Sequence, residues 1–247
     1  MWDERRGCHV QNRGTLMVVS AHAADFVWRA GGAIALYSDR GWTVRVLCLT
    51  YGERGESARL WKEGKSLDEI KRIRREEAER AADILGAEVR FLDVGDYPIE
   101  VTPDLRDALV QEFRKYRPDV LLSHTFVDPY NADHPRTAEL VREARILAQA
   151  HGYPSEYPPI GAPQLYSFEP HQPEQCQFRI DLLLDITPVF EKKRQAMECM
   201  EAQEHLWAYY TDLAKRRGVQ AGRNSGQPIV YAEAYQRVFP SVGGEFV

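Results

Sequence analysis

Short apolar runs alternate with longer amphipathic segments through residue 150 of the chain. The runs at residues 15–20 (TLMVVS) and 43–50 (TVRVLCLT) are rich in β-branched residues, as is typical of strands covered on both faces. Residues 25–40 between them have a helical pattern, which Gly41 ends. A strand, a helix and a strand in this length predict a βαβ unit with parallel strands and a right-handed crossover.

The same alternation continues toward the middle of the chain. Apolar positions mostly three to five residues apart predict an amphipathic helix over residues 67–85, which Gly86 can end. Thr102 is suited to cap a later helix, and Pro135 is suited to open another at its first position. The further elements predicted here are, in order, strand 88–94, helix 102–116, strand 119–124 and helix 135–150.

After residue 151 the pattern becomes less regular, and several prolines indicate a loop at 153–163. The remaining elements are predicted, in order, as strands 164–168 and 178–186, a long helix from 187 towards 210, a loop over 218–228 and a short helix over 231–236. Together the elements predict an α/β fold, a three-layer α/β/α sandwich with a Rossmann-like, mostly parallel sheet. Residues 1–14 are predicted as an N-terminal extension and residues 15–247 as a single α/β domain.

Composition and charge narrow the class of protein. The 247 residues carry a formal net charge of −5 and are 44% hydrophobic, which fits one globular core and argues against a nucleic-acid or anionic-membrane partner. No apolar run approaches the ~20 residues that span a bilayer, and the charged start of the chain does not have the apolar centre of a secretory signal. The four cysteines are scattered without a CxxC pair. These features predict a cytoplasmic enzyme or binding protein.

Metal-binding residue types stand at the carboxyl ends of predicted strands, where open α/β sheets bind their ligands. His22 and Asp25 are three apart across a strand-to-helix junction, and His134 comes just before a later helix. Two imidazoles and one carboxylate leave a tetrahedral Zn²⁺ one open position, as in catalytic zinc sites, and Asp133 is suited to orient His134. Mn²⁺, Fe²⁺ or Co²⁺ also suit this set. The spacing alone equally allows Asp25 as a helix cap and His22 as a core histidine.

Three motifs resemble those of a known family. The stretch SAHAADFVWRAGGAIAL, the segment TYGERGES after the next strand and the segment NADH before a later helix are similar to the PIG-L/LmbE-like zinc proteins, most of which are N-acetyl-sugar deacetylases. The resemblance extends from Leu16 to about Phe239 and includes the C-terminal segment YAEA. It implies that His22, Asp25 and His134 bind zinc.

The sequence departs from the deacetylase pattern at the positions that perform amide hydrolysis. The family's general-base aspartate is replaced by Ala24, and a histidine that steadies the oxyanion in many deacetylases is replaced by Asn131. Loss of the base is expected to slow amide hydrolysis by several orders of magnitude, about 10²–10⁴-fold for proton transfer alone. Retained metal ligands without this machinery indicate a different reaction on the same scaffold.

One branch of the family fits this combination. The segments AHAADFVWRAGGAIA and YGERGES are similar to its 4-oxalomesaconate hydratases, which add water to an unsaturated tricarboxylate in gallate breakdown. This resemblance implies zinc and a catalytic glutamate in the GERGES loop (residues 52–57), which we place at Glu53. His171 is the second candidate for acid/base chemistry or substrate binding. Zinc can polarise substrate oxygens or activate water, and a glutamate can move the proton.

A tricarboxylate substrate also requires cationic and polar partners. The candidates are Arg54, Arg29, Asn131 and Arg223, the last with Asn224 able to reach a neighbouring subunit's site. Related folds that form rings of subunits suggest a homo-oligomer such as a hexamer. Two other functions remain open: a zinc-dependent N-acetyl-sugar deacetylase with a displaced general base, and a protein that binds zinc or carboxylates without catalysis.

Overall fold

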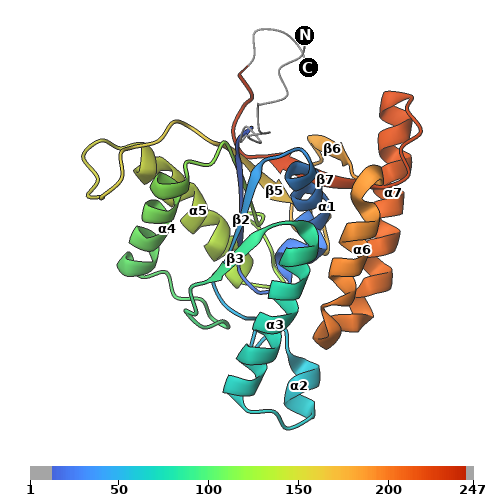
Figure 1. Ribbon diagram of the computed structural model, residues 1–247, viewed down its shortest axis with the longest axis horizontal. Coiled ribbons are helices and arrows are strands. Elements are labelled where there is room, and N and C mark those ends of the chain that lie inside the picture. Colours follow the sequence, from blue (N-terminus) through green and yellow to red (C-terminus); the bar gives the residue numbers. More distant parts are fainter. Residues whose placement is uncertain (1–12, 243–247) are drawn as a thin grey trace, which may run out of the picture.

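A computed structural model describes residues 13–242 of the chain (Figure 1). Most of the predicted N-terminal extension, residues 1–14, lies outside this range. The division into an extension and one domain over 15–247 therefore stays a prediction.

The described residues contain one seven-stranded sheet that agrees with the predicted α/β fold. Its strands lie in the order β3 (Glu88–Phe91), β2 (Thr43–Cys48), β1 (Thr15–Ser20), β4 (Val120–Ser123), β5 (Gln164–Phe168), β7 (Ala232–Arg237) and β6 (Leu182–Asp185). The first five are parallel, and β7 pairs antiparallel with β5 and β6. The sheet is thus mostly parallel, as the βαβ pattern predicts.

Helices cover both faces of the sheet and make the predicted three layers (Figure 1). They are α1 (Asp25–Asp39), α2 (Ala58–Lys62), α3 (Leu67–Leu85), α4 (Pro103–Tyr116), α5 (Asp133–Gln149), α6 (Phe190–Glu198) and α7 (Trp207–Ser225). Strand β1 shows why both faces are apolar: Leu16 and Val18 pack toward α1, α3, α6 and α7, while Met17 and Val19 pack toward α4 and α5. Alternate residues of a strand point to opposite faces, so a strand covered on both sides is apolar throughout.

Several predicted helix ends are confirmed by their hydrogen bonds. Thr102 accepts the N–H of Leu105 at 3.1 Å, and Gly86 ends α3 in the left-handed conformation at φ 75°. The helix predicted to open at Pro135 begins two residues earlier, at Asp133. Helix α2, directly after the GERGES loop, was not predicted from the sequence.

The predictions for the last sixty residues are partly wrong. The single helix from 187 to 210 is replaced by short 3₁₀ segments (Thr187–Val189 and Glu201–Leu206) with α6 between them, and α7 continues through most of the predicted loop 218–228. Residues 231–236, predicted as a helix, form β7. The strand predicted at 178–186 covers only Leu182–Asp185. Here pairing within the sheet overrides local helix propensity.

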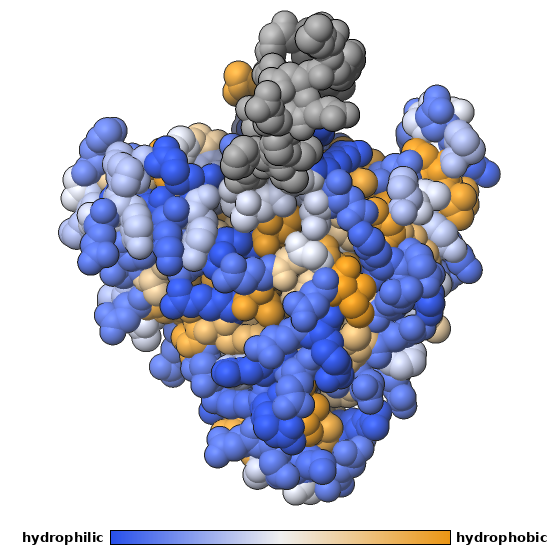
Figure 2. Space-filling view, viewed as in Figure 1, coloured by the Kyte–Doolittle hydropathy of each residue, from blue (hydrophilic) through white to orange (hydrophobic). Residues whose placement is uncertain are grey.

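The face of the molecule in Figure 2 is mostly hydrophilic, with apolar side chains in smaller groups between the helices. Among residues 13–242, no helix combines the length and the apolar character that crossing a bilayer demands.

Candidate metal centre and active site

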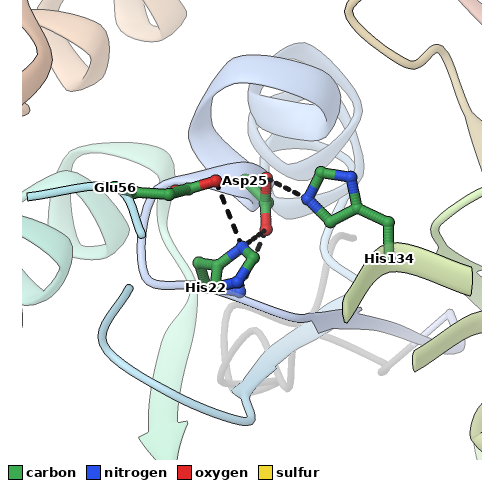
Figure 3. A group of neighbouring side chains, drawn as sticks. All are labelled: His22, Asp25, Glu56 and His134. Carbon is green, nitrogen blue, oxygen red and sulfur yellow. Dashed lines mark hydrogen bonds and ion pairs between the residues drawn. The ribbon is translucent and has the colours of Figure 1, made fainter. Parts of the chain in front are cut away.

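Segments that follow three neighbouring strands bring together four side chains of the types that bind metals (Figure 3). His22 follows β1, Asp25 is the first residue of α1, Glu56 lies in the GERGES loop after β2, and His134 is in the first turn of α5 after β4. Each offers one ligand atom, and these atoms all lie within 4.8 Å of one another. The three predicted ligands thus meet, and Glu56 joins them.

His22 lies at the centre of this group and is fully buried. Its Nδ1 is 3.2 Å from Asp25 Oδ2 and 3.2 Å from Glu56 Oε1, while its Nε2 is 3.4 Å from Asp133 Oδ2. Burial disfavours the charged ring, but Glu56, Asp133 and Asp25 outweigh it and hold the pKa of His22 well above its ordinary value. The surrounding carboxylates therefore favour a cation here, either a proton on His22 or a metal ion.

His134 has the arrangement expected of a metal-binding histidine. Its Nδ1 lies 2.7 Å from Asp128 Oδ2, so the tautomer suited to metal binding has its proton on Nδ1 and its lone pair on Nε2. Within residues 13–242, the buried Nε2 has no hydrogen-bond partner, and it lies 3.7 Å from Asp25 Oδ1. An orphaned imidazole nitrogen that faces a carboxylate and a second histidine fits a divalent metal.

The carboxylates that orient the two histidines differ from the prediction. Asp133, predicted to orient His134, faces His22 and also accepts the backbone N–H groups of Tyr97 and Ile99 at 2.9 and 2.8 Å. Asp128 orients His134 in its place. The reason is local: Asp133 is the first residue of α5, where its side chain turns back toward the loop after β3.

His124 packs beside the group as a neutral ring. Burial, and after it the neighbouring His134, lowers the pKa of His124 to about 3. Its Nε2 accepts the N–H of Ala21 at 2.9 Å, and its ring stacks on that of His134 with centroids 4.1 Å apart. The backbone of the loop after β1 is held in this way beside His22.

The two glutamates of the GERGES loop have different surroundings. Glu53 Oε2 accepts the N–H of Tyr51 at 3.1 Å, its Oε1 is buried without a partner among the described residues, and burial raises its pKa. Glu53 is not part of the four-residue group. Glu56, which was not among the predicted site residues, lies against His22 with 15% of its side chain exposed. Two glutamates three residues apart in one loop left the sequence no means to choose between them.

The other predicted site residues lie at varying distances from the group. Arg29 is buried, with Nε 3.3 Å from Asp25 Oδ1. The Arg54 guanidinium donates to the carbonyl of Asp96 at 2.6 Å, and Asn131 Oδ1 accepts the N–H of Asp133 at 3.1 Å. Arg223 is exposed near the C-terminal end of α7. Of these four, Arg29 contacts Asp25 through its side chain, and Asn131 accepts the backbone N–H of His134 at 3.3 Å through its carbonyl.

His171 lies in the loop after β5, with its ring stacked on Tyr209 at 4.2 Å between centroids. Burial, followed by the charge of Arg29, lowers its pKa, so the ring is neutral at pH 7.

An open cavity of about 670 Å³ adjoins the group, lined by Glu56 and by residues of α2 and Glu201–Leu206. Tyr97 also lines it, with its ring centroid 6.0 Å from that of His22. No motif or spacing in the sequence pointed to Tyr97. A small molecule in this cavity would meet Glu56 beside the proposed metal ligands.

The comparisons with known proteins agree with this site. The PIG-L family model, described as GlcNAc-PI de-N-acetylase, matches residues 17–145. A 4-oxalmesaconate hydratase of Pseudomonas putida is 55% identical over 231 residues, which cover 92% of this chain and 90% of that protein. A diacetylchitobiose deacetylase of Thermococcus kodakarensis is 28% identical and covers 90% of this chain and 82% of that protein.

Solved structures give the same order of similarity. The crystal structure of GalB, the 4-carboxy-2-hydroxymuconate hydratase from Pseudomonas putida, is 53% identical with a TM-score of 0.92, and the match covers 95% of this chain and all of that one. The N,N'-diacetylchitobiose deacetylase from Pyrococcus horikoshii has a TM-score of 0.77 at 24% identity, over 91% of this chain and 84% of that one, which supports the fold alone.

Proposed function

This chain belongs to the PIG-L family, and from that premise we propose that it is a metal-dependent hydratase. It adds water to the carbon–carbon double bond of 4-oxalomesaconate, the 4-carboxy-2-hydroxymuconate tautomer, and yields 4-carboxy-4-hydroxy-2-oxoadipate in gallate or protocatechuate catabolism. The observation that carries this proposal is the 55% identity to a hydratase along nearly the whole chain. We also propose that the enzyme is cytoplasmic and a homo-oligomer.

The site chemistry favours hydration over amide hydrolysis. Ala24 is fully buried at the position of the deacetylases' general base, so no carboxylate can act from there. Asn131 is engaged by the backbone N–H of Asp133 at the start of α5. A deacetylase on this scaffold would need Glu56 as its base.

His22, Asp25 and His134 would hold the metal, which we propose to be Zn²⁺. When bound, a divalent metal supplies Lewis-acid polarisation of substrate oxygens and so stabilises an enolate-like charge. Asp133 contacts Nε2 of His22 and Asp128 contacts Nδ1 of His134, so Nδ1 of His22 and Nε2 of His134 are the nitrogens that would face the metal.

Glu56 is the proposed proton-transferring residue. Burial opposes its ionisation, but His22 outweighs burial and holds the pKa of Glu56 below its usual range. An ionised carboxylate can accept a proton from water as the oxygen bonds to one alkene carbon, and the same group can return it to the neighbouring carbon. His171 is the second candidate for this transfer, and Arg29 is the proposed partner of a substrate carboxylate.

The experiment that tests the function is hydration of 4-oxalomesaconate by zinc-loaded protein, followed as loss of the conjugated enone absorbance. We expect the absorbance to fall with enzyme and to persist after metal removal by a chelator. Release of acetate from N-acetyl amino sugars without enone loss would instead assign the deacetylase function. Stoichiometric zinc with neither activity would assign the non-catalytic binding role.

A further inference from the structure

A buried ion pair joins the C-terminal part of the chain to the middle of α1. Lys193 of α6 and Glu233 of β7 are both buried, and the ammonium lies 2.6 Å from the carboxylate. The carboxylate also accepts the backbone N–H groups of Gly32 (2.7 Å) and Ala33 (2.8 Å) and the hydroxyl of Tyr235 (2.6 Å). Glu233 belongs to the YAEA segment, which the proposed chemistry does not use.

Lys193 binds the same turn of the helix through a different backbone group. Its ammonium donates to the carbonyl of Trp28 at 2.9 Å. In a regular α-helix that carbonyl accepts the N–H four residues later, which is the N–H of Gly32. The ion pair therefore contacts both partners of one helical hydrogen-bonding position: Lys193 binds the carbonyl of Trp28, and Glu233 accepts the N–H of Gly32.

Two glycines make room for the pair. A Cβ at Gly32 would lie 2.6 Å from Ile186 Cγ2 and 2.9 Å from Glu233 Oε1. A Cβ at Gly31 would lie 3.3 Å from Lys193 Cγ. Glycine weakens a helix interior relative to alanine, so these positions are explained by close approach and not by helix propensity. The Gly31–Gly32 pair and the YAEA segment thus serve one contact.

The turns of α1 that precede Gly32 contain residues of the site. Asp25 opens the helix within the four-residue group, and Arg29 contacts Asp25 one turn later. Arg29 and the two charged partners, Lys193 and Glu233, line one cavity of about 20 Å³. A short, continuous part of α1, residues 25–33, therefore connects the ion pair to the site.

We propose that the Lys193–Glu233 pair is a positioning device that fixes the first two turns of α1 along its axis and thereby sets Asp25 and Arg29 in the site. A buried ion pair adds little net stability because the cost of desolvation offsets the attraction. Its multiple directional contacts, however, hold α1 in one place relative to α6 and β7. This inference rests on the proposed metal centre.

The test compares a neutral pair of similar shape, Lys193→Met with Glu233→Gln, with the wild type. In metal-free protein, amide hydrogen exchange is measured for peptides that cover residues 25–33, and Zn²⁺ affinity is measured by competition with a chromophoric chelator. We expect faster exchange confined to 25–33, which includes the N–H groups that Glu233 accepts, and a Zn²⁺ affinity lower by roughly tenfold, the scale of an outer contact in a metal site. Tyr235→Phe, which removes one hydroxyl contact, should change both in the same direction by less.

Arg114→Met is the matched control, since Arg114 is a buried cation on α4 that donates to carbonyls at the C-terminal end of α5, such as those of Ala148 and Ala150. It should lower the melting temperature and leave both readouts near wild type. The proposal would be overturned if the folded double variant exchanged faster throughout the protein and bound Zn²⁺ with unchanged affinity. The pair would then have only a structural role. If the pair variant does not fold, Glu233→Gln and Tyr235→Phe give the same decision. Neither readout uses the substrate, so a failed hydratase assay would not affect this test. The exchange measurement also uses metal-free protein, so it does not depend on the identity of the metal.

Discussion

At the scale of single residues, environment separates Glu53 from Glu56 although both lie in one short loop. The carboxylate of Asp96 accepts the N–H groups of Arg54 and Gly55 at 2.8–3.1 Å, which fixes the loop between the two glutamates. Gly55 is needed because any Cβ there would overlap the ring of Tyr97. The loop therefore turns Glu53 toward its own backbone and Glu56 toward His22.

This difference gives a paired prediction. Glu56→Gln should lower kcat for hydration by about 10²–10⁴-fold, the usual contribution of a positioned proton-transfer group. Glu53→Gln changes a side chain that lies outside the four-residue group and keeps an oxygen for the N–H of Tyr51, so it should leave kcat within a few-fold of wild type. Steady-state kinetics on zinc-loaded variants checks both. A large loss in Glu53→Gln with normal activity in Glu56→Gln would return the role to Glu53.

The neutral state of His171 gives a prediction about pH. Burial and the charge of Arg29 lower its pKa, so the midpoint of its titration should lie below the ordinary histidine value of about 6.5. Arg29→Met removes the second cause and should raise the pKa of His171, which histidine ring NMR measures directly. Arg54→Met is the control, because Arg54 is held by Asp96 and should leave the titration unchanged. A His171 that titrates above 6.5 in the wild type contradicts the assignment.

At the scale of elements, the amino-terminal two thirds were predictable because local signals and tertiary structure agree there. Strand 15–20 and helix 67–85 carry their own periodicity and end signals, and both are confirmed. The C-terminal elements depend on contacts distant in sequence. Residues 231–236 are rich in helix-forming types but form β7, because β5 and β6 supply hydrogen-bonding partners on both sides.

Helix α7 shows the same conflict at Gly218, which we interpreted as a loop residue. A Cβ there would overlap the carbonyl of Val230, so the glycine lets the segment before β7 cross the helix closely. Gly218→Ala should therefore destabilise the protein by about 1–3 kcal/mol through overpacking, although glycine to alanine in an open helix stabilises by roughly 0.5–1 kcal/mol. Urea unfolding shows whether the substitution lowers or raises the free energy of unfolding. Val219→Ala, at an exposed neighbour, is the control and should change little.

At the scale of the whole molecule, the site lies where the order of the sheet reverses. The chain builds β1, β2 and β3 toward one edge and then places β4 and β5 on the other side of β1. Ligands of such sheets bind at this switch point, and His22 and His134 follow its two strands. The residue types at the strand ends and the family resemblance predicted His22, Asp25 and His134 as ligands, and these side chains meet here. The sequence could not predict the strand order or which loop glutamate completes the group.

At this position a bound metal would connect segments that are distant in the sequence. Metal binding should therefore stabilise the folded protein. A metal that binds only the folded protein stabilises it by about 2.7 kcal/mol at a free concentration of 100 Kd, which raises the melting temperature by roughly 5–10 °C for a chain of this size. Zn²⁺ should therefore raise the melting temperature of metal-free protein in a thermal scan. His134→Ala removes a ligand from α5 and should abolish the shift, whereas His151→Ala, at an exposed histidine just after α5, should retain it. His134 is the proposed ligand that follows β4. If His134→Ala showed the same rise in melting temperature as the wild type, the ion would bind outside the proposed site.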